Sequence, residues 1–230
     1  MINLDIRQFN SNTWAKSSAT IIHEAIKSIL QQKGVCNILL PGGRSAESLY
    51  LAWIQLPEFK LLSGVNIYFC DERCVPKHDS QSNYQLAFSI LFHSSVPNGF
   101  RIFRIEAEEP DIENAAFRYA DLIPLVIDIA IFGVGEDGHI ASLFPGDPAV
   151  HEFSRLIMPV IGPKAPFQRI SITPLVIKKI DKIFILVSGV SKSAVLKKAI
   201  KDHYNVSEYP VRLLIHGTWL IDSEIIIPND

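Results

Sequence analysis

Short apolar runs alternate with helical segments along most of this chain, and that alternation constrains the fold more than any other feature. The runs at residues 35–40, 65–70, 126–132 and 183–187 have strand length and are almost continuously hydrophobic. Such continuity is typical of strands that are covered on both faces. Helical patterns occupy residues 13–32, 45–53, 83–91, 112–122, 174–180 and 191–200. We therefore predict an α/β fold, a mostly parallel sheet with helices on both faces.

Weaker patterns extend this prediction. Residues 156–160, the RISIT run that begins at Arg169, and residues 211–215 are further candidate strands. No internal repeat, low-complexity tract or linker divides the sequence. We therefore expect a single domain over residues 1–230.

Charge and hydropathy exclude several classes of protein. The formal net charge of −2 and the pI of about 6.4 give no field that would gather nucleic acid or an anionic membrane surface. No apolar run approaches the roughly 18 residues that span a bilayer, and the N-terminus lacks the pattern of a leader peptide. We expect a cytoplasmic protein, a monomer or small homo-oligomer, that binds neither nucleic acid nor membranes.

The three cysteines are too few, and odd in number, for a disulfide framework. Cys70, Cys74 and His78 are spaced by four residues, which on a helix would place them on one face. Pro76 and the β-rich run VNIYF indicate a strand end and a loop instead. We therefore expect no metal site at these residues.

In an open α/β sheet, ligands bind at the carboxyl ends of the strands, where loops lead into helices. The loop after the first apolar run reads Pro41-Gly42-Gly43-Arg44-Ser45. Its glycines let the backbone approach a ligand closely, and the first N–H groups of the next helix favour an anion such as phosphate. An ordinary strand-to-helix turn is the alternative.

Charged residues follow other strands. Asp71-Glu72-Arg73 comes after residues 65–70 and is suited to orient sugar hydroxyls and to stabilise a developing negative charge. Arg169 begins the RISIT run, and Lys192 lies in GVSK before a helix, so each is a candidate phosphate ligand. Solvated surface residues and weak surface ion pairs are the alternative for all of them.

The loop after residues 126–132 reads GVGEDGHIASLFPG, residues 133–146. Its glycines match the dinucleotide fingerprint GxGxxG, but Pro145 and Gly146 truncate the helix that this fingerprint requires. The glycines instead predict a tight turn that presents His139, with Asp137 two residues before it. Because neutral imidazole can take a proton from water, we predict that His139 is a general base. The remaining histidines have no such setting, and we interpret them as surface or structural residues: His23, His78, His93, His151, His203 and His216.

Taken together, these segments resemble the 6-phosphogluconolactonase family, in the superfamily that also holds glucosamine-6-phosphate deaminase. DERCVP and GVGEDGHIASLFPG are the most specific pieces, while PGGRS, RISIT and GVSK are looser; all occur in family order. The resemblance implies hydrolysis of 6-phospho-D-glucono-1,5-lactone to 6-phosphogluconate, in the oxidative pentose phosphate pathway. It also implies that no metal or organic cofactor takes part, and a fold like that of the deaminase and ribose-5-phosphate isomerase.

The resemblance further implies roles for individual residues. His139, with Asp137 beside it, would activate water, and loop N–H groups or Arg73 would stabilise the oxyanion. Asp71 and Arg73 would line the sugar site. The remaining positions would hold the phosphate: Gly42, Gly43, Arg44, Ser45, Arg169 and Lys192. Arg44 stands where the family commonly has a small residue, which leaves open whether Arg44 or Arg169 contacts the phosphate. No GxSxG elbow is present, in agreement with direct attack by water.

Two other functions are weighed against the lactonase. Glucosamine-6-phosphate deaminase has a similar DGH loop, but it carries a glutamate five residues after the histidine, where this chain has Phe144, and typically an aromatic residue where Arg73 stands. A non-catalytic sugar-phosphate sensor would need a DNA-binding segment, and a first helix from about residue 13 leaves no room for one before it. Both alternatives are therefore less favoured.

Overall fold

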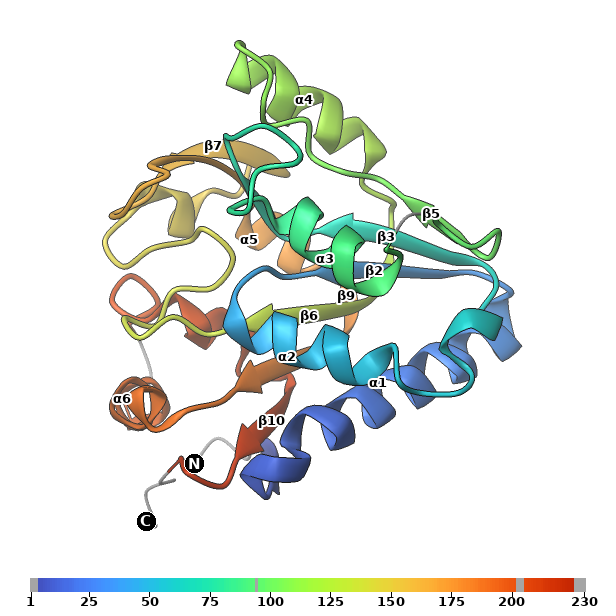
Figure 1. The fold of residues 1–230 in the computed structure, drawn as a ribbon. Helices are drawn as coiled ribbons and strands as arrows, with labels where there is room; N and C mark the ends of the chain where they lie inside the picture. Colours follow the sequence, from blue (N-terminus) through green and yellow to red (C-terminus); the bar gives the residue numbers. More distant parts are fainter. Residues whose placement is uncertain (1–3, 94, 202–204, 226–230) are drawn as a thin grey trace.

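Seven parallel strands form the central sheet of the structure, a computed structural model that describes residues 4–93, 95–201 and 205–225. Across the sheet their order is β1-β10-β9-β6-β2-β3-β5 (Figure 1). Every pair of neighbours in this sheet runs parallel. The strands span Asp5–Phe9 (β1), Cys36–Leu40 (β2), Val65–Phe69 (β3), Phe100–Ile102 (β5), Ile127–Gly133 (β6), Ile180–Val187 (β9) and Thr218–Asp222 (β10).

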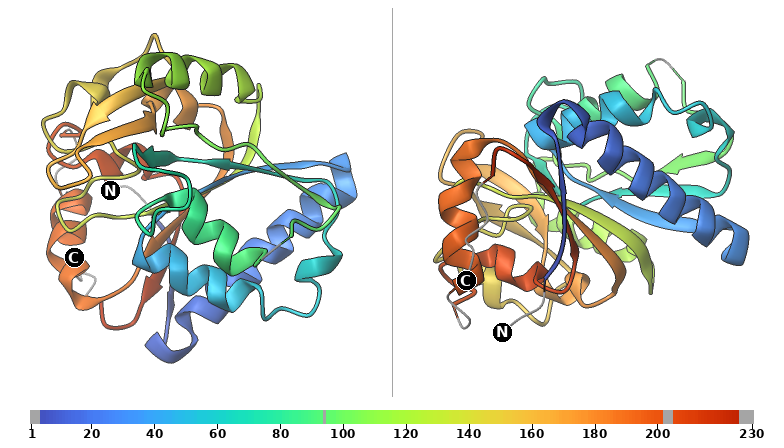
Figure 2. Two further views of the ribbon diagram at one scale, coloured as in Figure 1. Left: turned by 45° about the horizontal axis from the view of Figure 1, so that its top comes forward. Right: turned by 90° about the horizontal axis from the view of Figure 1, so that it is seen from below.

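Helices cover both faces of this sheet. The chain passes from β1 to β2, then to β3 and then to β5, always in one direction across the sheet. From β5 it returns to β6, then to β9 and then to β10, in the opposite direction. Because such crossovers are right-handed, the two sets of helices lie on opposite faces (Figure 2). One set comprises α1 (Ser11–Lys33), α2 (Arg44–Trp53) and α3 (Asn83–Leu91), and the other α4 (Ile112–Leu122), α5 (Pro174–Ile177) and α6 (Ser193–Lys201). Four short 3₁₀ helices are η1 (Phe59–Leu61), η2 (Pro148–His151), η3 (Val190–Lys192) and η4 (Pro210–Leu214).

A second, smaller sheet is antiparallel. It consists of β4 (Asp71–Arg73), β8 (Gln168–Ile172) and β7 (Ile157–Ile161), with β8 in the middle. α4 packs on β7. This sheet brings the residues that follow β3 next to a segment that lies about a hundred positions later in the sequence, because Asp71 pairs with Ser171.

The strand order reverses between β2 and β6, which are neighbours in the sheet. The loop after β2 leads to one face and the loop after β6 to the other, and ligands of open α/β sheets bind at such a switch point. The two loops begin close together, since a Cβ on Gly133 would lie 4.0 Å from the carbonyl oxygen of Gly42. The loops that carry PGGRS and GVGEDGH are therefore candidate ligand-binding loops.

The burial of the strands explains the sequence pattern. β6 is buried at six successive positions, and β2 and β3 at four of five. α1 begins at its cap Asn10, whose side chain accepts from Asn12 N–H, and ends at Gly34 with a left-handed φ of +71°. The predicted α/β class and parallel sheet are confirmed. Within the described ranges, no helix is both long and apolar enough to cross a membrane.

The structure corrects several predicted elements. Residues 211–215 are not a strand but lie mostly in η4, because Pro210 starts a helical turn and a short apolar run suits either structure. The strand expected there is β10, a few residues later. The predicted helix 174–180 ends at Ile177, since β9 already begins at Ile180. β1 and β5 were not predicted; they are edge strands with few buried residues.

Candidate active site

His139 and Asp137 form a hydrogen-bonded pair in the loop that follows β6. The Asp137 carboxylate lies 2.6 Å from Nδ1 of His139 and also accepts from the His139 backbone N–H at 3.1 Å. An ionised carboxylate can only accept, so in the neutral ring Nδ1 carries the proton and Nε2 keeps its lone pair. The side chains are 34% and 44% exposed. The imidazole is therefore oriented by Asp137 and is partly open to a ligand.

Gly135 makes room for this pair. A Cβ at Gly135 would lie 2.0 Å from Nδ1 of His139 and 2.5 Å from Oδ1 of Asp137. The Gly135 N–H donates to the His139 carbonyl and its own carbonyl accepts from Gly138, which has a left-handed φ of +88°. The glycines of the apparent dinucleotide fingerprint thus form the turn that holds His139.

The pKa of Asp137 is lowered from 3.8 to about 2. Burial acts in the opposite direction, but the hydrogen bonds and charge attraction from His139 outweigh it. Asp137 is consequently a carboxylate near neutral pH. It can fix the orientation of the imidazole and stabilise an imidazolium without itself exchanging a proton.

Phe144 contacts both His139 and Arg169. Its ring centroid lies 4.9 Å from that of His139, and the guanidinium carbon of Arg169 lies 5.6 Å from the centre of the Phe144 ring. This contact brings a cation from β8 close to the histidine loop. On the imidazole of His139, position 144 therefore contributes an apolar ring and Asp137 contributes the carboxylate.

Arg169 and Arg73 lie directly opposite one another in the β4–β8 ladder. Opposite residues of an antiparallel pair project to the same face, and like charges there repel. Burial lowers the pKa of Arg169, and the positive charge of Arg73 lowers it further, while Asp71 opposes the shift. The ε-nitrogen of Arg73 is buried and makes no hydrogen bond within the described part of the chain. An anion bound across the two guanidinium groups would relieve this repulsion.

A second group of cations, Arg44 and Lys192, lies near the loop after β2. Gly43, with φ of +89°, is the N-cap of α2. Because it is a glycine, no cap side chain accepts from the N–H groups of the first helical turn. Arg44 is almost fully exposed and approaches Glu136 at 3.8 Å. Burial lowers the pKa of Lys192, Glu136 raises it, and Arg44 lowers it again. Lys192 therefore lies near both the α2 N-terminus and the histidine loop.

Two serines join the start of α2, which follows the loop after β2, to the end of β9. Ser45, in the first turn of α2, shares a hydrogen bond of 2.9 Å with Ser188. The predicted phosphate residues after β2 and after β9 thus belong to one region. Ser188 was not predicted from the sequence, because no motif marks it.

Asp71 and Glu72 are buried rather than exposed to a ligand. Asp71 is 5% exposed, and its two carboxylate oxygens accept from Asn83 at 3.0 Å and Ser142 at 2.6 Å. Glu72 accepts from the backbone N–H groups of Asn83 and Tyr84 and from the Ser82 hydroxyl, at the N-terminus of α3. Burial raises the pKa of Glu72, and these hydrogen bonds partly offset the rise.

All three residues of the DER motif are therefore tied to the segment just before and at the start of α3. Arg73 completes the set by donating to the Gln81 carbonyl. Asn83 and Ser142, which bind Asp71, were not predicted as site residues. The only sequence signal for Asn83 is its place at a helix start, which also fits a simple capping role.

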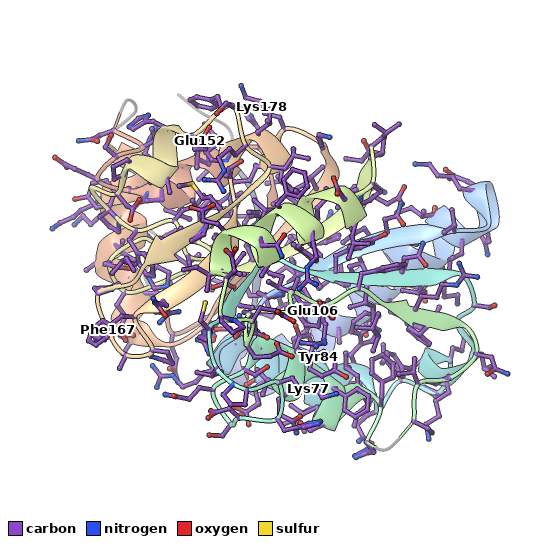
Figure 3. All side chains as sticks on the ribbon, turned by 90° about the horizontal axis from the view of Figure 1, so that it is seen from above. Lys77, Tyr84, Glu106, Glu152, Phe167 and Lys178 are labelled. Atoms are coloured by element: carbon purple, nitrogen blue, oxygen red, sulfur yellow. The ribbon has the colours of Figure 1, made fainter. Side chains whose placement is uncertain are left out.

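A hollow of about 790 Å³ lies elsewhere, at the β5 edge between α3 and α4. Tyr84 and Glu106 lie near one another in this part of the molecule (Figure 3). Its arginines include Arg104, which pairs with Glu106 and Glu108, and Arg118, which pairs with Glu106 and Glu109. Because acids already neutralise these cations, the hollow selects no particular ligand, and we assign it no function.

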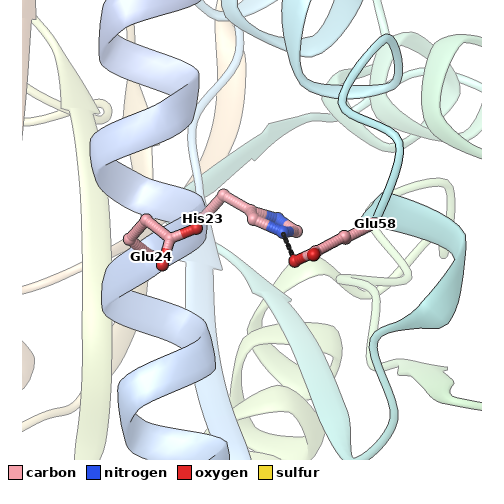
Figure 4. Close-up of side chains that lie close together, drawn as sticks. All are labelled: His23, Glu24 and Glu58. Carbon is pink, nitrogen blue, oxygen red and sulfur yellow. Dashed lines mark ion pairs between the residues drawn. The ribbon is translucent and has the colours of Figure 1, made fainter.

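His23, Glu24 and Glu58 have the composition of a metal site, with ligand atoms within 4.8 Å of one another (Figure 4). Two contacts argue against a metal. The Trp53 indole N–H donates to Nδ1 of His23 at 3.2 Å, so in the neutral ring Nε2 carries the proton and has no lone pair. The Lys27 ammonium already lies against both carboxylates. We interpret this group as structural, as expected for His23; His203 lies outside the described residues.

His23 should make stability depend on pH. Burial lowers its pKa from 6.5, Lys27 also lowers it, and Glu24 and Glu58 oppose the shift. The unfolded chain therefore takes up this proton more readily, and the free energy of unfolding falls as the pH drops below about 6.5, by at most about 1.4 kcal/mol per pH unit. Replacing His23→Gln keeps an acceptor for Trp53 without a titrating group. Thermal unfolding between pH 7.5 and 5.5 should show a shallower decline of Tm for this variant; equal slopes would refute the assignment.

Comparison with known proteins identifies relatives of this chain by sequence and by fold. The 6-phosphogluconolactonase 4 of Saccharomyces cerevisiae is 31% identical over 238 residues, which cover 89% of this chain and 92% of that protein. A crystal structure of a 6-phosphogluconolactonase from Shewanella baltica has a TM-score of 0.83 at 21% identity, covering 96% and 97% of the two chains. A monomeric glucosamine-6-phosphate deaminase has a TM-score of 0.82 at 20% identity, covering 96% and 98%. These two likenesses show the fold alone, and the fold does not separate the two enzymes.

A histidine–carboxylate pair and several cations at the switch point of a parallel sheet are typical of α/β proteins that bind small anionic molecules. The sequence model of the family described as glucosamine-6-phosphate isomerases/6-phosphogluconolactonase matches residues 10–221 of this chain. The chain belongs to this family.

Proposed function

We propose that this chain hydrolyses 6-phospho-D-glucono-1,5-lactone to 6-phosphogluconate, a step of the oxidative pentose phosphate pathway. The observation that carries the proposal is the His139–Asp137 pair beside Phe144. The pair suits activation of water, and the aromatic ring occupies the position where a deaminase would need its carboxylate. The similarity to a yeast 6-phosphogluconolactonase over most of both chains supports the same substrate.

The proposed mechanism requires one base and no covalent intermediate. Nε2 of His139 takes a proton from a water molecule as the water oxygen attacks the lactone carbonyl carbon. Asp137 stabilises the resulting imidazolium. When the tetrahedral intermediate collapses, the bond from the carbonyl carbon to the ring oxygen breaks, and the imidazolium returns the proton to that oxygen. The acid product then loses a proton to solvent.

The cations suit the two negatively charged groups of this reaction, the substrate phosphate and the oxyanion of the tetrahedral intermediate. We assign the phosphate to Gly42, Gly43, Arg44 and Ser45 at the α2 N-terminus and to Lys192, with Arg169 as a further candidate. We assign the oxyanion to loop N–H groups or to Arg73, which lies opposite Arg169 in the β4–β8 ladder. Asp71 would act on the sugar site indirectly, because its oxygens are bonded within the protein.

A coupled assay separates this function from its two alternatives. Fresh lactone is supplied with 6-phosphogluconate dehydrogenase and its nicotinamide cofactor as the reporter, and the rate is compared with spontaneous hydrolysis. A lactonase accelerates the reporter signal and releases no ammonia from glucosamine 6-phosphate. Ammonia release would identify a deaminase, and binding of 6-phosphogluconate without turnover of either substrate would identify a sensor. A cytoplasmic location stays a prediction.

Removal of a phosphate ligand should weaken substrate binding. We expect Lys192→Ala and Arg169→Ala each to raise KM about tenfold or more, with a smaller effect on kcat, because a charged hydrogen bond to the non-reacting phosphate is lost. Lys182→Ala is the matched control, since Lys182 is exposed in the amino-terminal half of β9. Steady-state kinetics decide the point: unchanged KM in both variants would remove these residues from the phosphate site.

A further inference from the structure

We propose that Asn83 is a positioning residue for the reaction, which acts on His139 through Asp71 and Ser142. The inference rests on the proposed function for its kinetic consequences, although the contacts that carry it do not depend on the substrate. Asn83 is the first residue of α3 and is 1% exposed. It lies outside every segment that suggested chemistry in the sequence.

The Asn83 amide holds the buried carboxylate of Asp71. Its Nδ2 donates to the Asp71 side chain at 3.0 Å and to the Asp71 backbone carbonyl at 2.9 Å. No lysine or arginine among the described residues lies within ion-pair distance of Asp71. Neutral donors must therefore satisfy this buried charge, and Asn83 and Ser142 supply them.

Ser142 transmits this constraint to the histidine loop. Its hydroxyl donates to Asp71 at 2.6 Å, and its backbone N–H donates to Ser171 on β8 at 3.2 Å. Ser142 is fully buried and lies three residues after His139. These two bonds fix the turn of residues 140–143, which the Leu143 N–H to Ile140 carbonyl bond closes.

That turn contains a strained residue. Ala141 has a φ of +49°, a left-handed conformation that residues with a Cβ rarely adopt. Such a conformation persists only where the surrounding bonds enforce it. The bonds of Ser142 to Asp71 and Ser171 are the enforcing contacts next to Ala141. Loss of either partner should let the turn relax and move His139, two residues before it.

Asn83 also contacts the loop after β2. A Cβ on Gly42 would lie 1.8 Å from Oδ1 of Asn83, so only glycine fits at this position. Oδ1 has no hydrogen-bond partner within the described ranges. One buried amide therefore packs against the proposed phosphate loop and bonds to the acid that holds the histidine loop. This arrangement holds the loop after β2 and the histidine loop in fixed positions relative to one another.

The test is a double-mutant cycle on kcat with Asn83→Ala, Ser142→Ala and the combined variant. We expect each single change to lower kcat about 10–100-fold, as displacement of a catalytic group does, and to change KM much less. If both act through Asp71, the combined loss should be close to the larger single loss rather than the product of the two. A product of the two losses would overturn the proposal, as would wild-type kcat in Asn83→Ala.

Further variants separate positioning from folding. Asn83→Asp keeps the size of the side chain but removes the donor, and should lose kcat like Asn83→Ala. Asn66→Ala is the matched control: it removes a bond of 2.9 Å from another asparagine amide, to Asn37 near the amino ends of the strands, and should leave kcat unchanged. Circular dichroism and Tm show whether each variant folds. Full kcat in Asn83→Asp would contradict the proposed donor role.

A spectroscopic measurement makes the outcome independent of turnover. Imidazole ¹H–¹⁵N correlation spectra, with the His139 signal assigned from His139→Asn, report the surroundings of that ring. The signal should move in Asn83→Ala and Ser142→Ala and stay in place in Asn66→Ala. If the wild type lacks lactonase activity, the proposed function fails while this shift still tests the connection. An unmoved His139 signal in Asn83→Ala would refute the connection itself.

Discussion

Replacing His139→Asn should lower kcat about 10²–10⁴-fold and leave KM within a few-fold of the wild type. The imidazole is the only group in the proposed mechanism that takes a proton from water, and a positioned general base contributes about this factor. Asparagine retains a polar side chain of similar size, so the substrate still binds. Steady-state kinetics in the coupled lactonase assay measure both constants.

His216→Asn provides the matched control for this prediction. His216 is exposed and lies just before the amino end of β10, at the edge of the sheet opposite the carboxyl-end loops. This variant should keep the kcat of the wild type. Wild-type turnover in His139→Asn would remove His139 from its role as base.

Replacing Gly135→Ala should have the second largest effect, a loss of about 10²-fold in kcat. The new Cβ would lie 2.0 Å from Nδ1 of His139, so either the imidazole or Asp137 must move. A displacement of about 1 Å at a catalytic group costs about this factor. The measurement is kcat, together with Tm to confirm that the variant folds.

Gly133→Ala is the matched control in the same loop. Its Cβ would meet nothing closer than the Gly42 carbonyl at 4.0 Å, and Gly133 does not have a left-handed φ. We expect this variant to retain most of its turnover. Equal activity of the two alanine variants would show that Gly135 does not support the histidine–aspartate pair.

The sequence predicted the helices and strands that have a local pattern of their own. The helices at residues 83–91 and 112–122 were predicted with their observed bounds from their helical patterns, and in the structure Ser82 and Asp111 cap them. The central strands were found because they are buried on both faces. The edge strands β1 and β5 were missed, since a partly exposed strand of three to five residues has no such pattern.

The long-range contacts of the site were beyond sequence patterns. Asp71 looked like a ligand for the sugar, but it is buried by its pairing with Ser171 and its bonds to Asn83 and Ser142. None of these partners lies within ten residues of Asp71, and no spacing in the sequence links Asp71 to Asn83, Ser142 or Ser171. The turn that presents His139 was predicted because a cluster of glycines is a local signal, whereas the contacts of Ser142 with Asp71 and Ser171 leave none.

A crystal structure with 6-phosphogluconate bound would test the central claim most directly. The account predicts that the product carboxylate, which derives from the lactone carbonyl, lies within hydrogen-bond distance of Nε2 of His139. The phosphate should lie at the N-terminus of α2 with Lys192. A product bound in the reverse orientation, with its phosphate beside His139, or bound in the hollow between α3 and α4, would contradict the account.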